Sequence, residues 1–268
     1  MKANNSYTAG YNKFLIGSFS QRNIGKELSF MLPYLEKDMN ILDGGCGPGI
    51  ITMEIARIVD PGKVIGLDIE DEQFKEAEEK ARKENQKNLC FVKGNAQKLP
   101  FEDSSFDLVL YHALLFHLSK PKKALKEAYR VLKKGGIICC RDSYMNGDIF
   151  HPECEEMNKA MEIAFKVLNH YKSYPNIGIK HSELLENAGF KDMKRSASYD
   201  FFDSGSMVKS YRTYAVHYIS ELHYDLIIEK KWSTDEEIQA IIKGLKDWGN
   251  DPMAFYARSR CESIAVKK

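Results

Sequence analysis

The sequence has 268 residues, of which 43% are hydrophobic and 29% charged, a composition typical of a soluble globular protein with one large domain or one domain with sizeable insertions. Its 39 basic and 38 acidic residues give a net charge of +1, which disfavours nucleic acid and anionic membranes as partners because the total charge produces no attractive field. No apolar run approaches the ~20 residues that span a bilayer, and the first residues lack the apolar core of a signal peptide, so we expect a cytoplasmic protein.

Short apolar segments alternate with amphipathic segments between residues 24 and 142. The apolar segments predict buried strands at 39–43, 63–68, 89–94, 106–112 and 135–142. The segments between them predict helices at 24–37, 49–60, 71–86 and 121–133. Pro33 marks a break or kink in the first helix, and Ile51, Ile55 and Ile58 are expected on one face of the second.

The pattern changes after residue 142. The later segments predict helices at 152–171 and 180–190, a strand at 191–202, a mostly helical stretch at 203–258 and a final strand at 260–268. No internal repeat, low-complexity tract or linker separates these segments from the first half of the sequence. We therefore expect a single domain over residues 1–268, in which two insertions, 143–180 and 203–258, form a lid over the substrate.

The alternation of apolar strands with helices indicates an α/β fold. Strands that are apolar along their whole length are typical of parallel sheets that helices cover on both faces. Right-handed crossover connections then favour a doubly wound, open sheet. Ligands of such sheets bind beyond the carboxyl ends of the strands, so residues at those ends are the first candidates for a functional site.

A glycine-rich segment follows the first predicted strand. Its glycines are spaced Gly45-x-Gly47-x-Gly49, which differs from the G-x-G-x-x-G of dinucleotide-binding loops and lacks the Gly-Lys-Ser/Thr of triphosphate-binding loops. Pro48 also removes one amide donor from the segment. The segment is therefore better suited to a neutral or zwitterionic ligand than to a pyrophosphate.

Two polar residues at the ends of the next strands complete a candidate nucleoside site. Asp68 ends the second strand, where a carboxylate can accept hydrogen bonds from both hydroxyls of a ribose. Asn95 follows the third strand, where a side-chain amide can bind the edge of an adenine. Together they indicate an adenosine site that does not require a phosphate.

Four segments, in this order, resemble the successive motifs of class I S-adenosylmethionine-dependent methyltransferases, and most closely the group of the ubiquinone and menaquinone biosynthesis methyltransferases. They are ILDGGCGPG, VIGLDIED, VKGNAQKLPFEDSSFDLVLYHALLFHL and EAYRVLKKGGII, all within residues 20–142. The resemblance implies a seven-stranded, mostly parallel, Rossmann-like sheet with helical lid insertions. It also implies S-adenosyl-L-methionine as the cofactor.

The resemblance further assigns cofactor contacts by position. The residues that it places at the methionine and ribose part of the cofactor are Gly45, Gly47, Gly49 and Asp68. Those that it places at the adenine or beside the cofactor are Ile69, Asn95, Ala96 and Tyr111. The chain departs from the family pattern at Asn95, where aspartate is common, and at Gly44, where a bulkier residue is common. An amide can still pair with adenine, and the glycine is expected to loosen the strand end.

The sequence predicts the methyl donor more clearly than the acceptor. Methyl transfer from a sulfonium is an in-line displacement, in which the protein mainly aligns the reacting atoms and excludes water. A general base is needed only where the acceptor must lose a proton. Candidate catalytic residues are His112 and His117 after the fourth strand and Asp142 at the end of the fifth. His117 could instead fix its loop, and Asp142 could instead hold Arg141 or orient a substrate cation.

Aromatic residues outside the four motifs are candidates for the acceptor pocket, although aromatics at helical spacing more often form a core. Those before the first helix are Tyr7, Tyr11 and Phe14, and those in the second insertion are Tyr211, Tyr214, His217 and Tyr218. Gln21 and Arg22 are placed to reach the carboxylate of the cofactor.

The predicted function is therefore methyl transfer from S-adenosyl-L-methionine to a small molecule, without a nucleic-acid or membrane partner. Six cysteines without CxxC spacing predict free thiols rather than disulfides or a metal site. Two alternatives stay open: a methyltransferase that acts on RNA or protein, and a cofactor-binding partner subunit without activity of its own.

Overall fold

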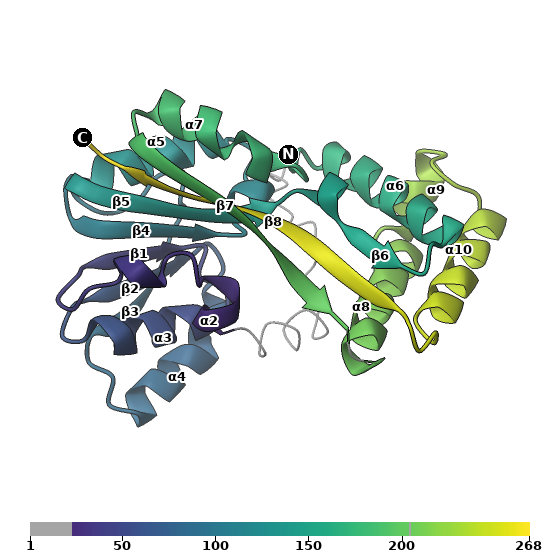
Figure 1. Cartoon of the computed structure of the whole chain (residues 1–268), viewed down its shortest axis with the longest axis horizontal. Helices are drawn as coiled ribbons and strands as arrows, with labels where there is room; N and C mark the ends of the chain where they lie inside the picture. The colour runs from purple at the N-terminus through teal and green to yellow at the C-terminus, as the bar shows by residue number, and fades with distance from the viewer. Residues whose placement is uncertain (1–22, 204) are drawn as a thin grey trace. The chain divides into compact units, whose positions relative to one another are not determined.

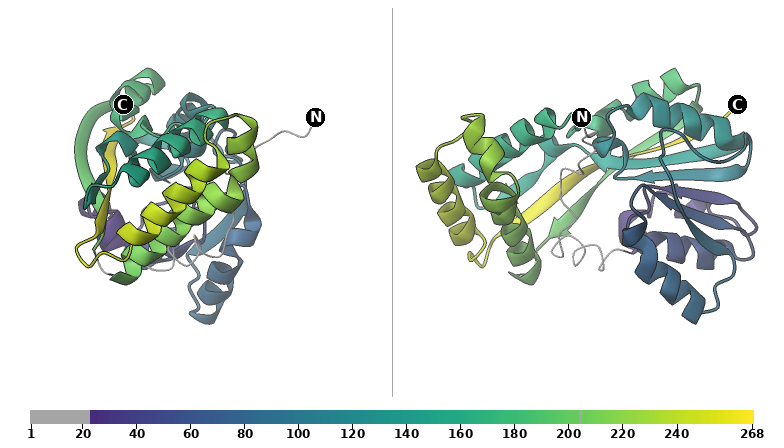
Figure 2. Two further views of the ribbon diagram at one scale, coloured as in Figure 1. Left: turned by 90° about the vertical axis from the view of Figure 1, so that its right-hand side faces the viewer. Right: turned by 180° about the vertical axis from the view of Figure 1, so that it is seen from behind.

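The computed structural model describes residues 23–203 and 205–268, whose strands form an eight-stranded sheet (Figures 1 and 2). The strands are β1 (Ile41–Gly44), β2 (Val64–Asp68), β3 (Leu89–Lys93), β4 (Phe106–His112), β5 (Leu132–Ser143), β6 (Ile149–His151), β7 (Lys191–Phe202) and β8 (Phe255–Val266). Their order across the sheet is β3-β2-β1-β4-β5-β8-β6, and β7 also pairs with β8.

Helices connect the strands. The α-helices are α2 (Ile24–Glu27), α3 (Ile50–Val59), α4 (Lys75–Lys83), α5 (Pro121–Val131), α6 (Glu155–His170), α7 (His181–Ala188), α8 (Gly205–His217), α9 (Tyr224–Glu229) and α10 (Asp235–Trp248). Short 3-10 turns lie at Leu32–Tyr34, Asp71–Phe74, Leu115–His117, Met145–Gly147 and Ile177–Lys180, and Tyr218–Leu222 forms a π-helix. None of the helices within the described ranges has both the length and the apolar content needed to cross a bilayer.

The described residues divide into two compact units. The sheet unit comprises Phe19–Tyr144 (described from residue 23), Asn176–Ser198 and Arg260–Lys268. The helical unit comprises Met145–Pro175 and Tyr199–Ser259. These boundaries lie close to the two predicted insertions, whose role as a substrate lid stays a prediction.

Side chains of the sheet unit alternate between two cores, one on each face of the sheet. Leu42 of β1 and Val109 of β4 pack in the core that contains the buried side chains of α5 and α7. Their neighbours Ile41 and Leu108 pack in the other core, with α3. Figure 1 shows α3 and α4 on the opposite side of these strands from α5 and α7. This two-sided burial explains why the strands are apolar along their length and confirms the predicted doubly wound, mostly parallel α/β fold.

The first five strands are parallel, and β8 is antiparallel to β5. In the β4–β5 register His112 pairs with Arg141, and in the β5–β8 register Arg141 pairs with Glu262. These pairings place His112, Arg141 and Glu262 next to one another on three neighbouring strands.

The helical unit has its own core of aliphatic and aromatic side chains. A capping box begins α10, because Thr234 Oγ1 accepts from Glu237 N–H at 3.2 Å and Glu237 Oε2 accepts from Thr234 N–H at 3.0 Å. The rings of Tyr211 and Tyr256 stack with centroids 3.9 Å apart. Burial raises the pKa of Tyr211 to about 12, so its phenol stays neutral in this core.

Two sequence predictions for the sheet unit are wrong. The predicted helix at 24–37 reduces to α2, which ends before Leu28 with its φ of −133°, and to a 3-10 turn at Leu32–Tyr34. The turn contains Pro33, where the sequence predicted a break or kink. Ile58 is 38% exposed, whereas Val59 is fully buried, since the buried face of α3 follows Ile51, Ile55 and Val59. The prediction that Ile51 and Ile55 share the buried face of α3 is therefore confirmed, and the prediction that Ile58 lies on the same face is wrong.

The strand count and two strand boundaries also differ from the prediction. Strand β5 begins at Leu132, within the predicted helix at 121–133, instead of at residue 135. The sheet has eight strands in the described residues instead of seven, because the short strand β6 pairs with β8 at Ile149–Ala257 and the next two positions. The last strand begins at Phe255 instead of residue 260. Residues 255–259 are rich in aromatic and arginine side chains, a pattern without the strict alternation that indicates a strand.

Candidate functional site

The segment between β1 and α3, residues 44–49 (the glycine loop), turns sharply because three glycines have positive φ angles. The φ angles of Gly45, Gly47 and Gly49 are 76°, 51° and 73°, a region that residues with a Cβ rarely adopt. A Cβ on Gly45 would lie 2.7 Å from the side chain of Leu114. A Cβ on Gly49 would lie 2.6 Å from the ring of Phe91. These two glycines therefore allow the loop to pack against the protein, and their contact with the cofactor stays a prediction.

Gly47 is bonded to the end of β2. Its N–H donates to Asp68 Oδ2 at 2.9 Å, and Glu70 N–H donates to Asp68 Oδ1 at 3.1 Å. A carboxylate has about four acceptor positions, so two of them remain for hydroxyl groups of a ligand. Among the described residues, a Cβ on Gly47 would meet Gln73 Oε1 alone, at 3.4 Å. The space and the acceptors beside Gly47 and Asp68 therefore fit a ribose.

Backbone hydrogen bonds fix the glycine loop to the neighbouring strand. Gly45 N–H and Cys46 N–H both donate to Leu67 O, at 2.6 and 3.1 Å. Gly94 N–H, which follows β3, donates to Asp68 O at 2.8 Å. The carboxyl ends of β1, β2 and β3 are thus connected directly, and the predicted ribose and adenine residues lie along one edge of the sheet.

Asp43 was not among the predicted site residues, although it ends the first apolar strand as Asp68 ends the second. Its side chain is buried, and Thr52 Oγ1 in α3 donates to its Oδ2 at 2.6 Å. Burial, Asp43 and Asp68 raise the pKa of the Cys46 thiol well above its usual value, so Cys46 stays neutral and is no nucleophile. Two carboxylates at this edge suit a ligand that carries positive charge.

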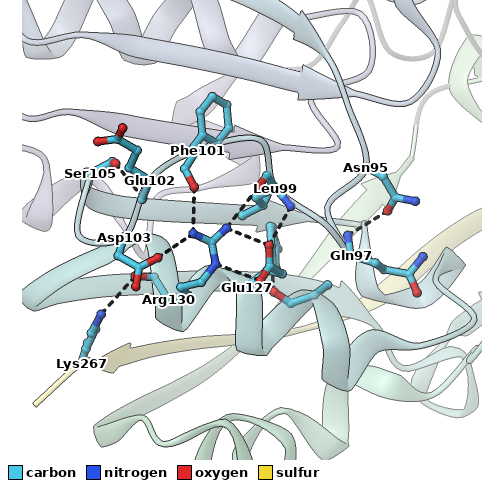
Figure 3. Close-up of polar contacts among 12 residues, drawn as sticks. Asn95, Gln97, Leu99, Phe101, Glu102, Asp103, Ser105, Glu127, Arg130 and Lys267 are labelled. Carbon is cyan, nitrogen blue, oxygen red and sulfur yellow. Dashed lines mark hydrogen bonds and ion pairs between the residues drawn. The ribbon is translucent and has the colours of Figure 1, made fainter.

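The predicted adenine residues follow β2 and β3. Asn95 Oδ1 accepts from Gln97 N–H at 2.8 Å, which fixes this side chain in a local turn and leaves its amide nitrogen to donate (Figure 3). Ala96 is buried, whereas Ile69 is 42% exposed directly after Asp68. An exposed apolar side chain beside the ribose position offers a surface for a flat base, so adenine contact by Ile69 and Asn95 remains our prediction.

Arg130 of α5 fixes the loop that leads into β4 (Figure 3). Its Nη2 donates to Leu99 O at 3.1 Å, and its Nη1 donates to Phe101 O at 2.8 Å and to Asp103 Oδ1 at 2.8 Å. Its Nε and Nη2 form a two-pronged ion pair with Glu127, at 3.0 and 2.9 Å. This ion pair holds the pKa of the Glu127 carboxyl below its usual value. The loop beside the predicted adenine position is thus fixed by one guanidinium.

Replacing Arg130 with methionine is expected to lower the free energy of unfolding by about 1–2 kcal/mol, because charge-assisted hydrogen bonds are lost while the aliphatic stem is kept. The value stays low because the Arg130 side chain is 31% exposed and water replaces part of the bonding. Urea denaturation measures the difference. Arg82→Met is the control, since the Nε of this exposed residue contacts Glu78 O at 3.4 Å, and equal losses in both variants would contradict the role of Arg130.

The side chain of Tyr111 is fully buried in the core of the sheet unit. Its hydroxyl donates to Ala124 O in α5 at 3.1 Å, and burial raises its pKa. Its ring fills the space beside Gly44, where a Cβ would lie 2.5 Å from Cε1 of the ring. Gly44 is therefore tightly packed instead of loosening the strand end. Because the side chain of Tyr111 is buried in this core, the predicted contact of Tyr111 with the cofactor would involve its backbone atoms.

His112, Arg141, Glu262 and Glu27 form a buried polar group, the Arg141 cluster. Arg141 Nη1 lies 3.3 Å from His112 Nε2, and Arg141 Nε lies 3.4 Å from Glu262 Oε1. Glu27 Oε2, from α2, lies 3.1 Å from Arg141 Nη1 and 3.3 Å from His112 Nε2. Arg141 is 0% exposed and His112 is 8% exposed, so these charges interact with little screening by water.

Asp142 lies on the opposite face of β5 from Arg141, because successive side chains of a strand alternate. It is fully buried, its Oδ1 accepts from Phe116 N–H at 3.1 Å, and its Oδ2 lies 3.1 Å from His181 Nε2. Asp142 therefore holds the loop after β4. The predicted catalytic residues Asp142 and His112 thus belong to two different groups of contacts.

The remaining predicted residues are placed as follows. His117 ends the 3-10 turn after β4, and its ring packs edge-on against Phe116, with centroids 4.6 Å apart. Tyr211 and Tyr218 are buried in the core of the helical unit, and the rings of Tyr214 and Tyr218 lie 5.8 Å apart. His217 ends α8 and lies 3.1 Å from Glu221. Outside the described residues lie Tyr7, Tyr11, Phe14, Gln21 and Arg22.

Comparison with known proteins points to one family. A family model described as a methyltransferase domain matches residues 35–199. The chain is 32% identical to a demethylmenaquinone methyltransferase of Lactococcus lactis, over 78% of each chain. It is 37% identical to an uncharacterised methyltransferase of Schizosaccharomyces pombe, over 55% of each chain, so it spans about half the length of that curated relative.

A solved structure has a similar fold. It is phosphoethanolamine N-methyltransferase 2 of Haemonchus contortus, solved with phosphomonomethylethanolamine and S-adenosylhomocysteine. The match covers 96% of this chain and 53% of that chain, with a TM-score of 0.57 and 18% sequence identity. At this identity the similarity concerns the fold alone.

Proposed function

The chain belongs to the class I S-adenosylmethionine-dependent methyltransferase family, and from this premise we propose that it transfers a methyl group from S-adenosyl-L-methionine to a small organic acceptor. The observation that carries the proposal is the hydrogen bond from Gly47 N–H to Asp68 Oδ2, at 2.9 Å. It joins the turn after β1 to a carboxylate that keeps acceptor positions for two ribose hydroxyls.

The described residues fit the proposed cofactor. Asp68 would hold the ribose, Ile69 and Asn95 the adenine, and the space beside Gly47 the chain that leads to the sulfur. Asp43 and Asp68 would supply negative charge for the sulfonium and the ammonium of the cofactor. A phosphate group would be repelled by the same two carboxylates, which agrees with the spacing of the glycines.

S-adenosyl-L-methionine supplies a methyl group that its positive sulfur already activates. The chain's own residues therefore need to bind and orient both reactants and to exclude water between them. Alignment of this kind lowers barriers by up to ~7–11 kcal/mol in well-oriented model systems. Where the acceptor must lose a proton, His112 at the end of β4 is the residue that we propose as the base.

We propose a small molecule as the acceptor for two reasons. The net charge of +1 provides no field that would attract RNA. The Lactococcus lactis relative named above also supports this class, since it is a demethylmenaquinone methyltransferase. A methyltransferase of RNA or protein, and a cofactor-binding subunit without activity, remain the alternatives.

Isothermal titration calorimetry with S-adenosyl-L-methionine is expected to give saturable, single-site binding. The protein and methyl-labelled cofactor are then incubated with cell fractions in three separate samples. One contains metabolites, one RNA and one protein. Label in the metabolite fraction is the expected result. Label in RNA or protein would favour the first alternative, and binding without any labelled product the second. Absence of saturable binding would overturn the proposal as a whole.

A further inference from the structure

We propose that His181 is a positioning residue for the cofactor site, because it holds Asp142 and Asp142 fixes the loop after β4, residues 113–118, against the glycine loop. The inference rests on the proposed function and adds to its site a support that lies outside the residues proposed to touch the cofactor. It also gives Asp142, a predicted catalytic residue, the role of a support instead of a base. All the residues concerned belong to the sheet unit.

His181 reaches Asp142 because the 3-10 turn before α7 lies against the end of β5. A Cβ on Gly178 in this turn would lie 2.9 Å from Asp142 O and 3.0 Å from Ser143 O, so only a residue without a side chain fits there. The helix α7 follows at once, and its Leu185 is fully buried in the core of the sheet unit. His181, the first residue of α7, is therefore held in place and is 1% exposed.

Both oxygens of the Asp142 carboxylate are used in hydrogen bonds. His181 Nε2 lies 3.1 Å from Oδ2, and Phe116 N–H donates to Oδ1 at 3.1 Å. Asp142 is 0% exposed, so water does not replace either bond. Because an ionised carboxylate only accepts, the hydrogen of the first bond is on His181 Nε2.

The other ring nitrogen of His181 supports this assignment. Its Nδ1 is buried and has no hydrogen-bond partner among the described residues. A hydrogen on Nδ1, as in a charged ring or in a ring that accepts from a protonated Asp142, would be a buried donor without an acceptor, which native proteins rarely contain. The neutral Nε2–H form leaves only a lone pair unused. His181 is therefore a fixed donor to Asp142.

The loop after β4 connects this pair to the glycine loop. Ala113 begins it with a φ of 52°, a strained conformation that persists only where the surrounding structure holds it. Ala113 N–H donates to a carbonyl of β5 at 2.7 Å, and the bond from Phe116 N–H to Asp142 holds the loop a second time. Leu114 lies between these two bonds and directly beside Gly45, where a Cβ would be 2.7 Å from Leu114 Cδ1. The position of Leu114 against the glycine loop thus depends on Asp142.

Loss of this support is expected to weaken cofactor binding. Without the donor from His181, the buried carboxylate of Asp142 has one partner fewer and no longer fixes the loop after β4. Leu114 then no longer holds the glycine loop in one conformation, and ordering that loop on binding costs affinity. His181 thus acts on the affinity for S-adenosyl-L-methionine through Asp142 and Leu114.

The test is calorimetric titration of three full-length variants with S-adenosyl-L-methionine, at a temperature at which all are folded. His181→Phe keeps a ring but removes the donor, and its affinity is expected to fall about tenfold. His181→Gln places an amide donor near the position of Nε2, so its affinity should stay within about twofold of the wild type. Phe190→Leu is the matched control, with the same expectation of about twofold. Its buried ring packs against Tyr129 beyond the other end of α7, so the variant loses stability without losing a bond to Asp142.

Nuclear magnetic resonance supplies two signatures that a loss of stability alone would not produce. In the wild type, long-range proton–nitrogen correlations are expected to show the ring of His181 protonated at Nε2, with the signals assigned by their absence from His181→Phe. The amide resonance of Phe116 is expected to shift in His181→Phe and to keep its position in Phe190→Leu.

A wild-type ring protonated at Nδ1, or an affinity that is equal in His181→Phe and Phe190→Leu, would overturn the inference. A loss of affinity that His181→Gln shares would also overturn it, because the effect would then not depend on the donor. The tautomer is read from the wild type alone, so the test stands even if a variant does not fold. Failure of the wild type to bind S-adenosyl-L-methionine would overturn the proposed function, whereas normal binding with the wrong tautomer would overturn only the role of His181.

Discussion

Replacing Asp68 with alanine is expected to weaken the binding of S-adenosyl-L-methionine ~10–150-fold, which corresponds to about 1.5–3 kcal/mol for hydrogen bonds to a charged group. The carboxylate is proposed to accept from the ribose hydroxyls, and it also accepts from Gly47 N–H at 2.9 Å and Glu70 N–H at 3.1 Å. Its loss therefore removes ligand contacts and releases the glycine loop at the same time. Calorimetric titration of both proteins with the cofactor measures the difference.

Asp71→Ala provides the matched control for this experiment. Asp71 also follows β2, but its Oδ1 forms an ion pair with Lys93 at 2.9 Å on the surface, and its side chain is 45% exposed. Surface pairs of this kind contribute little, so the affinity for the cofactor should stay within about twofold of the wild type. An Asp68→Ala variant that binds as tightly as this control would remove Asp68 from the cofactor site.

Replacing Gly49 with alanine is expected to lower the free energy of unfolding by about 2–4 kcal/mol. A part of this cost, about 1–2 kcal/mol, comes from placing a Cβ at a φ of 73°. The remainder comes from overpacking, because the new Cβ would lie 2.6 Å from the ring of Phe91 and 2.9 Å from Ala77 Cβ. Phe91 has little freedom to move, since its ring stacks on Phe74 with centroids 5.2 Å apart.

Gly135→Ala separates the two contributions. Gly135 also has a positive φ, 82°, but a Cβ there meets no described atom within 4 Å. This variant should therefore lose only the conformational part, about 1–2 kcal/mol. Chemical denaturation of the two variants gives the difference. Equal losses would show that the contact of Gly49 with Phe91 carries no energetic weight.

Much of the sheet unit was predictable because its strands are buried on both faces. Residues 64–67 and 108–111 form continuous apolar runs, and both strands form close to the predicted bounds. The segment 24–37 has equally apolar residues, but Pro33 prevents a continuous helix. Leu28 and Met31 are nevertheless fully buried, so the apolar spacing reflected burial and not a helix.

The candidate site was only partly predictable, because sequence position identifies residues at strand ends but not the residues that contact them. Residues that end parallel strands, such as Asp68 and His112, are found by their position after an apolar run. The other members of the Arg141 cluster are not, because Glu27 comes from a short helix and Glu262 from the last strand. Sequence spacing carries no information about contacts between residues this far apart in the chain. The register of β4, β5 and β8 places His112, Arg141 and Glu262 in a row, and α2 adds Glu27.

The pairing of Arg141 with Glu262 joins residues 121 positions apart, and this distance has a consequence for the synthesis of the chain. Strands β1 to β4, which carry the proposed cofactor residues, are complete in the growing chain long before β8 is made. Until then β5 has a free edge, and closing so long a loop delays its pairing further. A newly made chain therefore passes through a stage in which an unpaired apolar strand is exposed, and it is at this stage that pairing between different nascent chains competes with correct folding.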